Sequence, residues 1–205
     1  WSCRMSNKLK YESQMIKAGY RCIAGMDEAG RGPLAGPVVA ACVILPMDDL
    51  IEGVDDSKKL SEKKREELYD QIIRKAAAYG LGIIDERIID KINILNATKL
   101  AMKYAYYDMR KRADCLLVDA IDKLDVDCDV TGVIKGDSLS YLIGAASILA
   151  KVARDNIMRQ YELQYPEYCF EKHKGYATKL HCEMLIKHGP CDIHRRSFIK
   201  KIVNE

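Results

Sequence analysis

At 205 residues the chain is long enough for one domain with a full core, which would bury roughly 70% of the unfolded surface. Its composition is that of a soluble globular protein, and no apolar run approaches the ~18 residues of a membrane span, which excludes a membrane protein. Eight scattered cysteines without a CxxC motif exclude a disulfide scaffold, and the lack of a signal-peptide pattern predicts a cytoplasmic location. The net charge of +3 by itself excludes no class of partner.

The first third of the chain predicts two strands and a helix. Residues 20–29 form an apolar run that ends at two adjacent acids, and residues 36–46 form a second, buried strand. A helix is predicted from Ser61, a good N-cap, to Gly80, a good C-terminal stop.

Strands and helices continue to alternate along the chain. A short strand is predicted over 81–86 and a helix over 90–114, followed by strands over 115–120 and 130–136. Residues 138–165 have the apolar spacing of one long helix.

The chain after Pro166 predicts an irregular basic stretch, a helix near 177–188 and a short final helix past Arg195. No repeat, low-complexity tract or Gly/Ser linker divides the sequence. Because helices are interspersed among the strands, we predict one α/β domain: a mixed central β-sheet flanked by helices, with a helical C-terminal extension.

Charge is unevenly distributed. Between Lys172 and Lys201 there are eight Lys or Arg residues and two acids, a local charge of +6 that leaves −3 for the remainder. This arrangement suits a polyanion that a basic face holds and a carboxylate site attacks. A merely solvated helix face explains the same residues equally well.

Three acidic positions follow apolar strand-like runs: the pair Asp27 and Glu28, then Asp119, then Asp137. Because strand ends gather at one edge of a sheet, these acids can converge. Carboxylates ~4 Å apart repel each other by about 4 kcal/mol per pair, and two divalent cations would neutralise four of them. Oxygen ligands favour Mg²⁺ or Mn²⁺, and paired ions suit in-line displacement at phosphorus.

Simpler explanations remain for two of these acids. Asp137 could cap the long helix beside Ser138, and Asp119 could be a solvated strand end. The acids at 122, 125, 127 and 129 imitate a calcium loop, but Val130 and Gly136 replace its glycine and bidentate glutamate, so we interpret them as a solvated connection.

Two glycines surround an arginine directly after the first acids. Gly30 and Gly32 let the backbone approach a ligand closely, and Arg31 between them suits a phosphate or a sugar. The rival interpretation is a dinucleotide-binding turn of an enzyme that uses a nucleotide cofactor. That reading is weak, because Pro33 and Pro37 interrupt the helix that such a motif must open.

Six blocks of the sequence resemble bacterial type 2 ribonuclease H (ribonuclease HII). In chain order they are GMDEAGRGPLAGPVVAACVIL, DDSKKLS, LLVDA, KGDSLSYLIGAASILAKVARD, HKGYATKLH and GPCDIHRRSF. The resemblance runs from about Gly19 to Phe198. Residues 1–18 resemble the join to an extra N-terminal domain of some relatives, so we assign them as a helical remnant or linker, and 19–205 as the catalytic domain with a basic helical region from about 166.

This resemblance implies an RNase H-like fold and metal-dependent cleavage of RNA in RNA–DNA hybrids. It also implies incision at single ribonucleotides embedded in duplex DNA, leaving 3′-hydroxyl and 5′-phosphate ends, with two Mg²⁺ or Mn²⁺ ions per site. We expect a monomer. A module that binds hybrid duplex or structured RNA without cutting is the principal alternative.

The resemblance also carries over individual residues. It assigns metal binding and catalysis to Asp27, Glu28, Asp119 and Asp137. The Gly30–Gly32 loop matches the family's sensor of the ribose 2′-hydroxyl, a group that is both donor and acceptor. Tyr176 matches a tyrosine that stacks on the neighbouring sugar, although its position also suits a core aromatic or an aromatic at a helix start. Ser57 and Lys58 match residues near the nucleic-acid backbone.

One local departure from the family pattern lies near the C-terminus. His181, Cys182, His188, Cys191 and His194 imitate a zinc site. Gly189 and Pro190 break any shared helix face. Of positions 188, 191 and 194, which follow at three-residue steps, the family block normally carries other residues at the first two. We therefore interpret the cluster as sequence drift.

Overall fold

The computed structural model describes residues 8–121 and 123–203. A five-stranded sheet with the order β3-β2-β1-β4-β5 forms its centre. The strands are β1 (Ile23–Ala29), β2 (Val38–Ile44), β3 (Ala78–Ile84), β4 (Cys115–Asp119) and β5 (Asp129–Val133). β1, β2 and β3 pair antiparallel, whereas β4 pairs parallel to β1 and β5 parallel to β4. The sheet is therefore mixed, as predicted.

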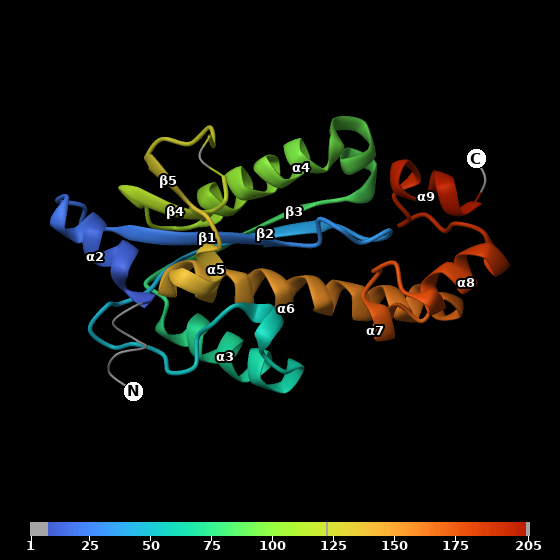
Figure 1. The fold of residues 1–205 in the computed structure, drawn as a ribbon, viewed down its shortest axis with the longest axis horizontal. Helices are drawn as coiled ribbons and strands as arrows, with labels where there is room; N and C mark the ends of the chain where they lie inside the picture. Colours follow the sequence, from blue (N-terminus) through green and yellow to red (C-terminus); the bar gives the residue numbers. More distant parts are fainter. Residues whose placement is uncertain (1–7, 122, 204–205) are drawn as a thin grey trace.

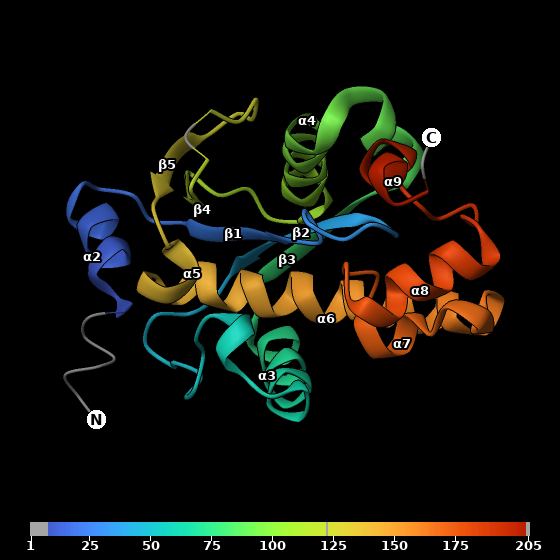
Figure 2. The ribbon, with the colours of Figure 1, turned by 45° about the vertical axis from the view of Figure 1, so that its right-hand side comes forward.

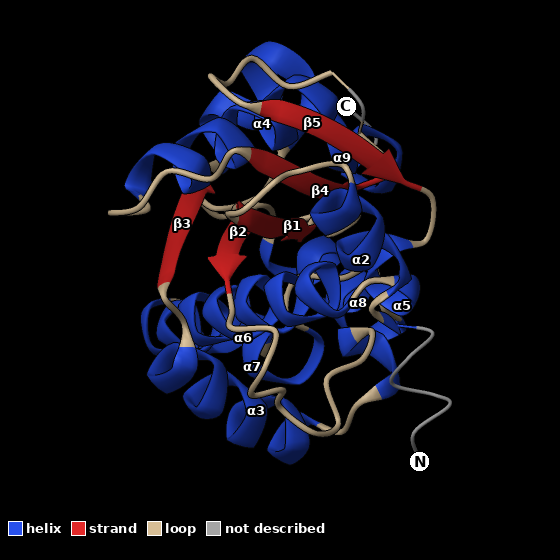
Figure 3. Cartoon of the chain, turned by 90° about the vertical axis from the view of Figure 1, so that its left-hand side faces the viewer, coloured by secondary structure: helices blue, strands red, loops and turns tan. Residues whose placement is uncertain are grey.

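Helices cover both faces of this sheet (Figures 1 and 3). The helices are α2 (Lys10–Lys17), α3 (Glu62–Lys75), α4 (Glu86–Asp108), α5 (Gly136–Leu139), α6 (Tyr141–Gln164), α7 (Phe170–His173), α8 (Lys179–His188) and α9 (Arg196–Val203). α4 lies on one face, and α6 lies on the other with α3 beyond it. The helices α7, α8 and α9 gather at one end (Figure 2).

Side-chain alternation along the strands divides the core into two layers. Ala41 and Leu117 pack into the layer beneath α6 and α3, whereas Cys42 and Leu116 pack into the layer beneath α4. Burial on both faces explains why β2 is apolar at every position.

Glycines bring the helices directly onto the strands. A Cβ at Gly25 of β1 would lie 2.1 Å from the backbone of Leu142 in α6, and one at Gly82 of β3 would lie 1.9 Å from the backbone of Ala101 in α4. Both helices therefore pack backbone to backbone against the sheet at these two positions.

The prediction of a helix from Ser61 to Gly80 was wrong over its last residues. Ser61 caps α3 as expected, but the helix ends at Lys75, and Gly80 lies inside β3. The physical reason is tertiary: a Cβ at Gly80 would lie 2.2 Å from the carbonyl oxygen of Ala105 in α4. The glycine provides room for a crossing helix and does not terminate one.

The helix predicted over 90–114 starts and ends earlier. Asp85 caps its start through the amide of Ile88, and the helix ends at Asp108. Asn93 interrupts it with a φ of 66°, and its side chain accepts a hydrogen bond from the amide of Asn96. α4 is thus two helical segments, and Asn93 begins the second.

The predicted helix after residue 138 divides into α5 and α6, because Ser140 is extended and caps α6 at the amide of Ile143. The stretch after Pro166, predicted as irregular, contains the 3₁₀ turn η2 (Pro166–Tyr168) and the short helix α7. The helices predicted near 177–188 and past Arg195 are present as α8 and α9.

The helix α2 packs onto the start of α6. Glu12 is buried, and its Oε1 accepts hydrogen bonds from the Ser140 hydroxyl (2.6 Å) and the Leu142 amide (3.0 Å). Residues 1–7 of the predicted 1–18 segment lie outside the described residues, and the division at residue 18 stays a prediction. None of the helices in the described part of the chain has the length and apolar character needed to cross a membrane.

Candidate active site

The parallel pairing of β1 and β4 places three acids at one edge of the sheet: Asp27 and Glu28 at the end of β1 and Asp119 at the end of β4. Met26 lies opposite Val118 in the register, so Asp27 and Asp119 follow on adjacent strands. By side-chain alternation both face α6, where Ser147 is close enough to lower the pKa of Asp27 and so oppose part of the effect of burial. Asp137 reaches the same region from α5, and its negative charge acts on Asp119.

Burial and mutual repulsion make these carboxylates difficult to ionise. Burial, then the charges of Glu28 and Asp119, raise the pKa of Asp27 well above its ordinary value. Burial also raises the pKa of Glu28, with Arg31 opposing the shift, and the pKa of Asp119, with Asp137 adding to it. The site therefore carries more buried negative charge than its own donors compensate.

One oxygen of each acid is held by a neighbouring donor. Backbone amides hold two of them: the Glu28 amide donates to Asp27 Oδ1 (2.8 Å), and the Gly136 amide to Asp119 Oδ1 (2.7 Å). Side-chain cations hold the others: Arg31 donates to Glu28 Oε1 (3.2 Å) and Lys58 to Asp137 Oδ2 (3.2 Å). These contacts orient the carboxylates.

The donor set fits a hard divalent cation in chemistry. All four groups are carboxylates, and Glu28 Oε2 is buried without a hydrogen-bond partner among the described residues. Yet no three His, Cys, Asp or Glu side chains anywhere in residues 8–121 and 123–203 are placed to hold a metal ion as they stand. The structure thus brings the acids into one neighbourhood without assembling a finished coordination shell.

Ser57 and Lys58 lie in the short turn η1 (Ser57–Lys59) beside the acids. Lys58 is mostly exposed, and although partial burial opposes the shift, Asp137 raises its pKa. The Ser57 hydroxyl instead turns inward, sharing a hydrogen bond of 2.8 Å with the Ser147 hydroxyl. Lys58 is the exposed member of the pair, while Ser57 holds Ser147, which lies on the α6 side near Asp27.

The two glycines of the Gly-Arg-Gly turn have different surroundings. Gly30 is buried with a φ of +96°, and a Cβ there would lie 2.2 Å from Nε of Arg154. Gly32 is exposed, and a Cβ there would meet nothing within 4 Å. Only Gly32 thus offers the open backbone approach expected of both residues, whereas Gly30 accommodates a neighbouring side chain.

Tyr176 lies on the surface near this turn. Its side chain is 39% exposed, and its ring lies 5.6 Å from both the Lys151 ammonium and the Arg154 guanidinium. Its exposure rules out a position inside the core, whereas its place just before α8 still suits the other alternative, an aromatic at a helix start. Part of the aromatic ring is therefore accessible at the surface.

Comparisons with known proteins cover most of this chain. The family model described as ribonuclease HII matches residues 24–201. The ribonuclease HII of Caldanaerobacter subterraneus subsp. tengcongensis is 55% identical over 193 residues, covering 94% of this chain and 80% of that protein. This chain belongs to the ribonuclease HII family. As a member it is a hydrolase, an endonuclease with ribonuclease H activity on RNA in hybrids.

Solved structures place this ribonuclease HII in the RNase H-like fold, as predicted. The crystal structure of ribonuclease H2 from Pyrococcus horikoshii OT3 superposes with a TM-score of 0.74 at 27% identity, covering 90% of this chain and 98% of that chain. The structure of Bst-RNase HIII in complex with Mn²⁺ superposes with a TM-score of 0.69 at 17% identity, covering 89% and 69%. The second comparison supports the shared fold.

The histidine cluster of this family member forms a buried hydrogen-bonded chain. His181 Nε2 lies 3.1 Å from His194 Nε2, and His181 Nδ1 lies 3.0 Å from the carbonyl oxygen of Tyr176. His194 Nδ1 in turn lies 3.0 Å from the Cys191 amide and 3.1 Å from its sulfur. Neutral histidines satisfy each contact, with one ring nitrogen donating and the other accepting.

The acids that imitate a calcium loop have separate partners. Lys103 pairs with Asp125 (2.5 Å), Arg112 pairs with Asp127 (2.9 Å), and the Tyr20 hydroxyl donates to Asp129 (2.6 Å). The fourth acid, at position 122, lies outside the described residues. These contacts fit the prediction of a solvated connection between strands.

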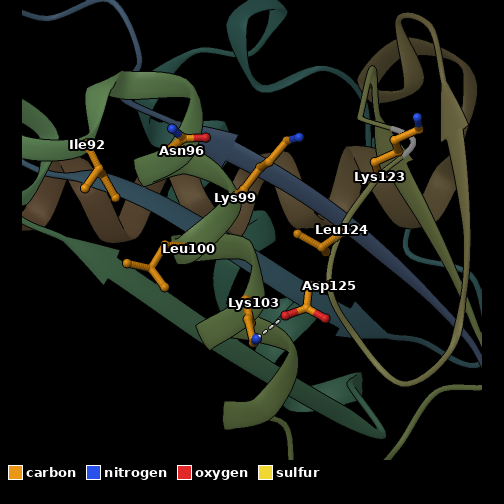
Figure 4. A pocket seen from close by; sticks show the side chains of 8 residues that line it. All are labelled: Ile92, Asn96, Lys99, Leu100, Lys103, Lys123, Leu124 and Asp125. Carbon is orange, nitrogen blue, oxygen red and sulfur yellow. Dashed lines mark hydrogen bonds and ion pairs between the residues drawn. The ribbon is translucent and has the colours of Figure 1, made fainter.

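A cavity of about 690 Å³ opens between α4 and the chain after β4 (Figure 4). Its lining consists of Ile92, Asn96, Lys99, Leu100, Lys103, Lys123, Leu124 and Asp125. None of the predicted site residues contributes to it. The carboxylate edge of the sheet therefore remains the candidate active site, on chemical grounds.

Sequence reasoning missed three residues that shape the site: Ser147, Arg154 and Arg195. Ser147 and Arg154 are seven residues apart on the buried side of α6, and both arginines are fully buried. Polar residues at helical spacing within an apolar face were the available signal for the first two. Arg195 was counted with the basic tract, and the structure corrects this, because its guanidinium faces the protein interior.

Proposed function

We propose that this ribonuclease HII is a metal-dependent endonuclease that also incises duplex DNA at single embedded ribonucleotides, leaving 3′-hydroxyl and 5′-phosphate ends. Its partners are RNA–DNA hybrid and ribonucleotide-containing duplex DNA. The observation that carries the proposal is the placement of Asp27, Glu28 and Asp119 at one sheet edge, directly before a turn whose Gly32 backbone is open.

The metal part of the proposal rests on the chemistry of the acids. Asp27, Glu28, Asp119 and Asp137 would hold Mg²⁺ or Mn²⁺, two ions per site. Bound ions would supply a nucleophilic hydroxide and Lewis-acid stabilisation of the leaving 3′-oxygen. Raised carboxyl pKa values and the unpartnered Oε2 of Glu28 support this proposal, since a cation would relieve both. Bst-RNase HIII, which shares the fold, binds Mn²⁺.

The chain's own side chains prepare the acids for that role. Arg31 and Lys58 each hold one oxygen of a carboxylate, and backbone amides hold one oxygen of Asp27 and of Asp119. Fixed carboxylates avoid reorganisation when substrate binds. Lys58 is also exposed enough to contact a phosphate of the nucleic-acid backbone.

Recognition of the ribonucleotide is assigned to the turn and the tyrosine. The N–H and C=O groups around Gly32 would pair with a ribose 2′-hydroxyl, which is both donor and acceptor. Tyr176 would stack on the neighbouring sugar, which its exposed ring supports. A deoxyribose in place of this ribose lacks the 2′-hydroxyl and would leave these backbone groups without a hydrogen-bond partner.

One assay tests the proposal. A DNA duplex with a single ribonucleotide is incubated with the protein and Mg²⁺ or Mn²⁺, beside an all-DNA duplex, and the ends of the products are analysed. We expect incision of the first duplex only, in the presence of metal, with 3′-hydroxyl and 5′-phosphate ends. Binding without incision under any divalent ion would instead support the binding module.

A further inference from the structure

Two arginines without surface exposure lie beneath the turn that follows the first acids. Arg154 of α6 and Arg195, just before α9, are both 0% exposed. Neither forms an ion pair with any carboxylate in the described part of the chain. Their charges are compensated instead by backbone carbonyl dipoles.

Arg195 binds both ends of the longer turn formed by residues 30–37, which includes Gly30–Gly32. Its Nη2 donates to the carbonyl oxygens of Gly30 (2.6 Å) and Gly36 (2.8 Å). Its Nη1 donates to Arg31 (3.0 Å), and its Nε also donates to Gly36 (2.9 Å). The planar guanidinium thereby sets the distance between the start and the end of the turn.

Arg154 joins the same turn to the segment that carries Tyr176. It donates to the carbonyl oxygens of Ala35 (3.1 Å), Pro37 (3.0 Å) and Lys174 (2.9 Å). The Leu34 amide adds a bond of 2.8 Å to the carbonyl oxygen of Gly175. A single side chain thus connects the turn, the tyrosine segment and α6.

This arrangement is costly for folding. Burial lowers the pKa of Arg195 to about 9, and repulsion from Arg154 adds to the shift. Apolar residues of similar size commonly stabilise a core as well as or better than buried charges do. Stability alone therefore does not explain two paired cations at this place.

The hydrogen bonds from the two arginines determine the shape of the turn. Five of its carbonyl oxygens, those of Gly30, Arg31, Ala35, Gly36 and Pro37, accept from the two arginines and therefore point inward. The space beneath Gly30 is filled by Arg154, while the side of Gly32 stays open. The arginines thereby decide which backbone groups face a ligand.

We propose that Arg154 and Arg195 are positioning residues that hold the Gly30–Gly32 turn and Tyr176 in the fixed arrangement needed to read one ribonucleotide. This inference rests on the proposed function. It assigns the two arginines to the rate of ribonucleotide incision and not to affinity for duplex nucleic acid.

The test uses Arg154→Lys and Arg195→Lys, which keep the charge but lose the planar set of donors. The control is Arg159→Lys on the same helix, because Arg159 is partly exposed and pairs with Glu62 and Glu66. On the single-ribonucleotide duplex we expect kcat to fall about 10–100-fold in both test variants, as misplacement by about 1 Å would produce. KM and the Kd for all-DNA duplex should stay within about threefold of wild type.

The possible results separate this inference from the proposed function. A wild-type protein that leaves the single-ribonucleotide duplex intact refutes the proposed function. Wild-type incision with an unchanged kcat in folded Arg154→Lys and Arg195→Lys overturns the positioning role alone, as does an equal loss in Arg159→Lys.

Amide hydrogen exchange of the wild-type protein provides a measurement that does not depend on variant folding. The Leu34 and Gly36 amides donate to the carbonyl oxygens of Gly175 and Ile193, both at 2.8 Å. A rigidly held turn predicts protection of these amides close to that of β1. Exchange at the rate of an unstructured loop would overturn the proposal even if neither lysine variant folds.

Discussion

At the scale of single residues, Asp27 is placed where its ionised form opposes folding but would serve the proposed metal-dependent chemistry. It is 4% exposed, and burial together with the charges of Glu28 and Asp119 raises its pKa. A carboxyl group in this position destabilises the metal-free protein whenever it is ionised. Groups with strongly perturbed pKa values of this kind concentrate at functional sites.

The substitution Asp27→Asn separates these two effects. Because an amide removes the repulsion, we expect cleavage of RNA in hybrid to fall at least about 100-fold while the metal-free protein becomes more stable. Calorimetry in EDTA should show the melting temperature rising by about 2–4 °C for each kcal/mol relieved. As a control, Asp125→Asn alters an exposed acid that pairs with Lys103, and cleavage should be unchanged. A lower melting temperature in Asp27→Asn would contradict the electrostatic explanation.

The two glycines of the turn make a matched pair. Gly30→Ala places a Cβ 2.2 Å from Arg154 Nε at a φ of +96°, so we expect a loss of more than about 1 kcal/mol of stability. Gly32→Ala meets no atom within 4 Å, so its stability should change by less than about 0.5 kcal/mol, while incision at a single ribonucleotide declines. Urea unfolding and the incision assay measure the two effects. Equal stabilities of Gly30→Ala and Gly32→Ala would argue against the assignment of Gly30 to the buried side of the turn and of Gly32 to its open side.

At the scale of elements, buried histidines hold the C-terminal helices against the turn. His181 of α8 contacts His194, and residue 194 forms a β-bridge with Ala35. Burial lowers the pKa of both histidines to about 4. The histidine chain thus connects α8, the start of α9 and the tyrosine segment in its neutral form only.

The depressed histidine pKa values predict an acid-sensitive contribution to stability. An unfolded histidine titrates near pH 6.5, so the contribution of the neutral folded form is fully present above that pH. It is lost as the pH falls from about 6.5 towards about 4, because the unfolded state then binds more protons. We expect His194→Gln to melt below wild type at pH 7.5 and the gap to narrow by pH 4.5. A constant gap across that range would be inconsistent with the mechanism.

At the scale of the whole molecule, positive charge is concentrated in the C-terminal part of the chain. The tract from Lys172 to Lys201 carries +6 against −3 elsewhere, but Arg195 is buried and does not belong to its surface. The remaining lysines include Lys200 and Lys201 on the exposed side of α9. We expect this end of the molecule to attract a polyanionic duplex, one of whose phosphates the acids would attack under the proposed function.

Salt dependence measures how much of that surface contacts phosphate. Each neutralised phosphate contributes a slope of about −0.9 to log K against log [salt]. We expect the double substitution Lys200→Gln and Lys201→Gln to make the slope for hybrid binding shallower by about 1–2, without changing the melting temperature. The comparison variant is Lys103→Gln on α4. A slope unaltered by the α9 substitutions would exclude that helix from the interface.

Much of this protein was predictable from local sequence. Apolar runs of strand length, the Ser61 cap and the adjacent acids before Gly-Arg-Gly depend on neighbours within a few residues. These local features were sufficient to predict the mixed sheet, most helices and the acids that lie together at its edge. The family followed from the same stretches, because the clustered acids and the residues of the turn occur in short continuous blocks.

Other features were decided only by the tertiary structure. Gly80 has the sequence signature of a helix stop, yet it lies in a strand because α4 crosses there. Gly30 and Gly32 look alike in the sequence, but a side chain from α6 fills the space behind only the first. In the sequence Arg195 belongs to a basic tract, but in the structure it is buried and donates to the carbonyl oxygens of Gly30 and Gly36, which are distant in the chain. Periodicity and caps are local, whereas burial and charge compensation depend on segments far apart in the chain.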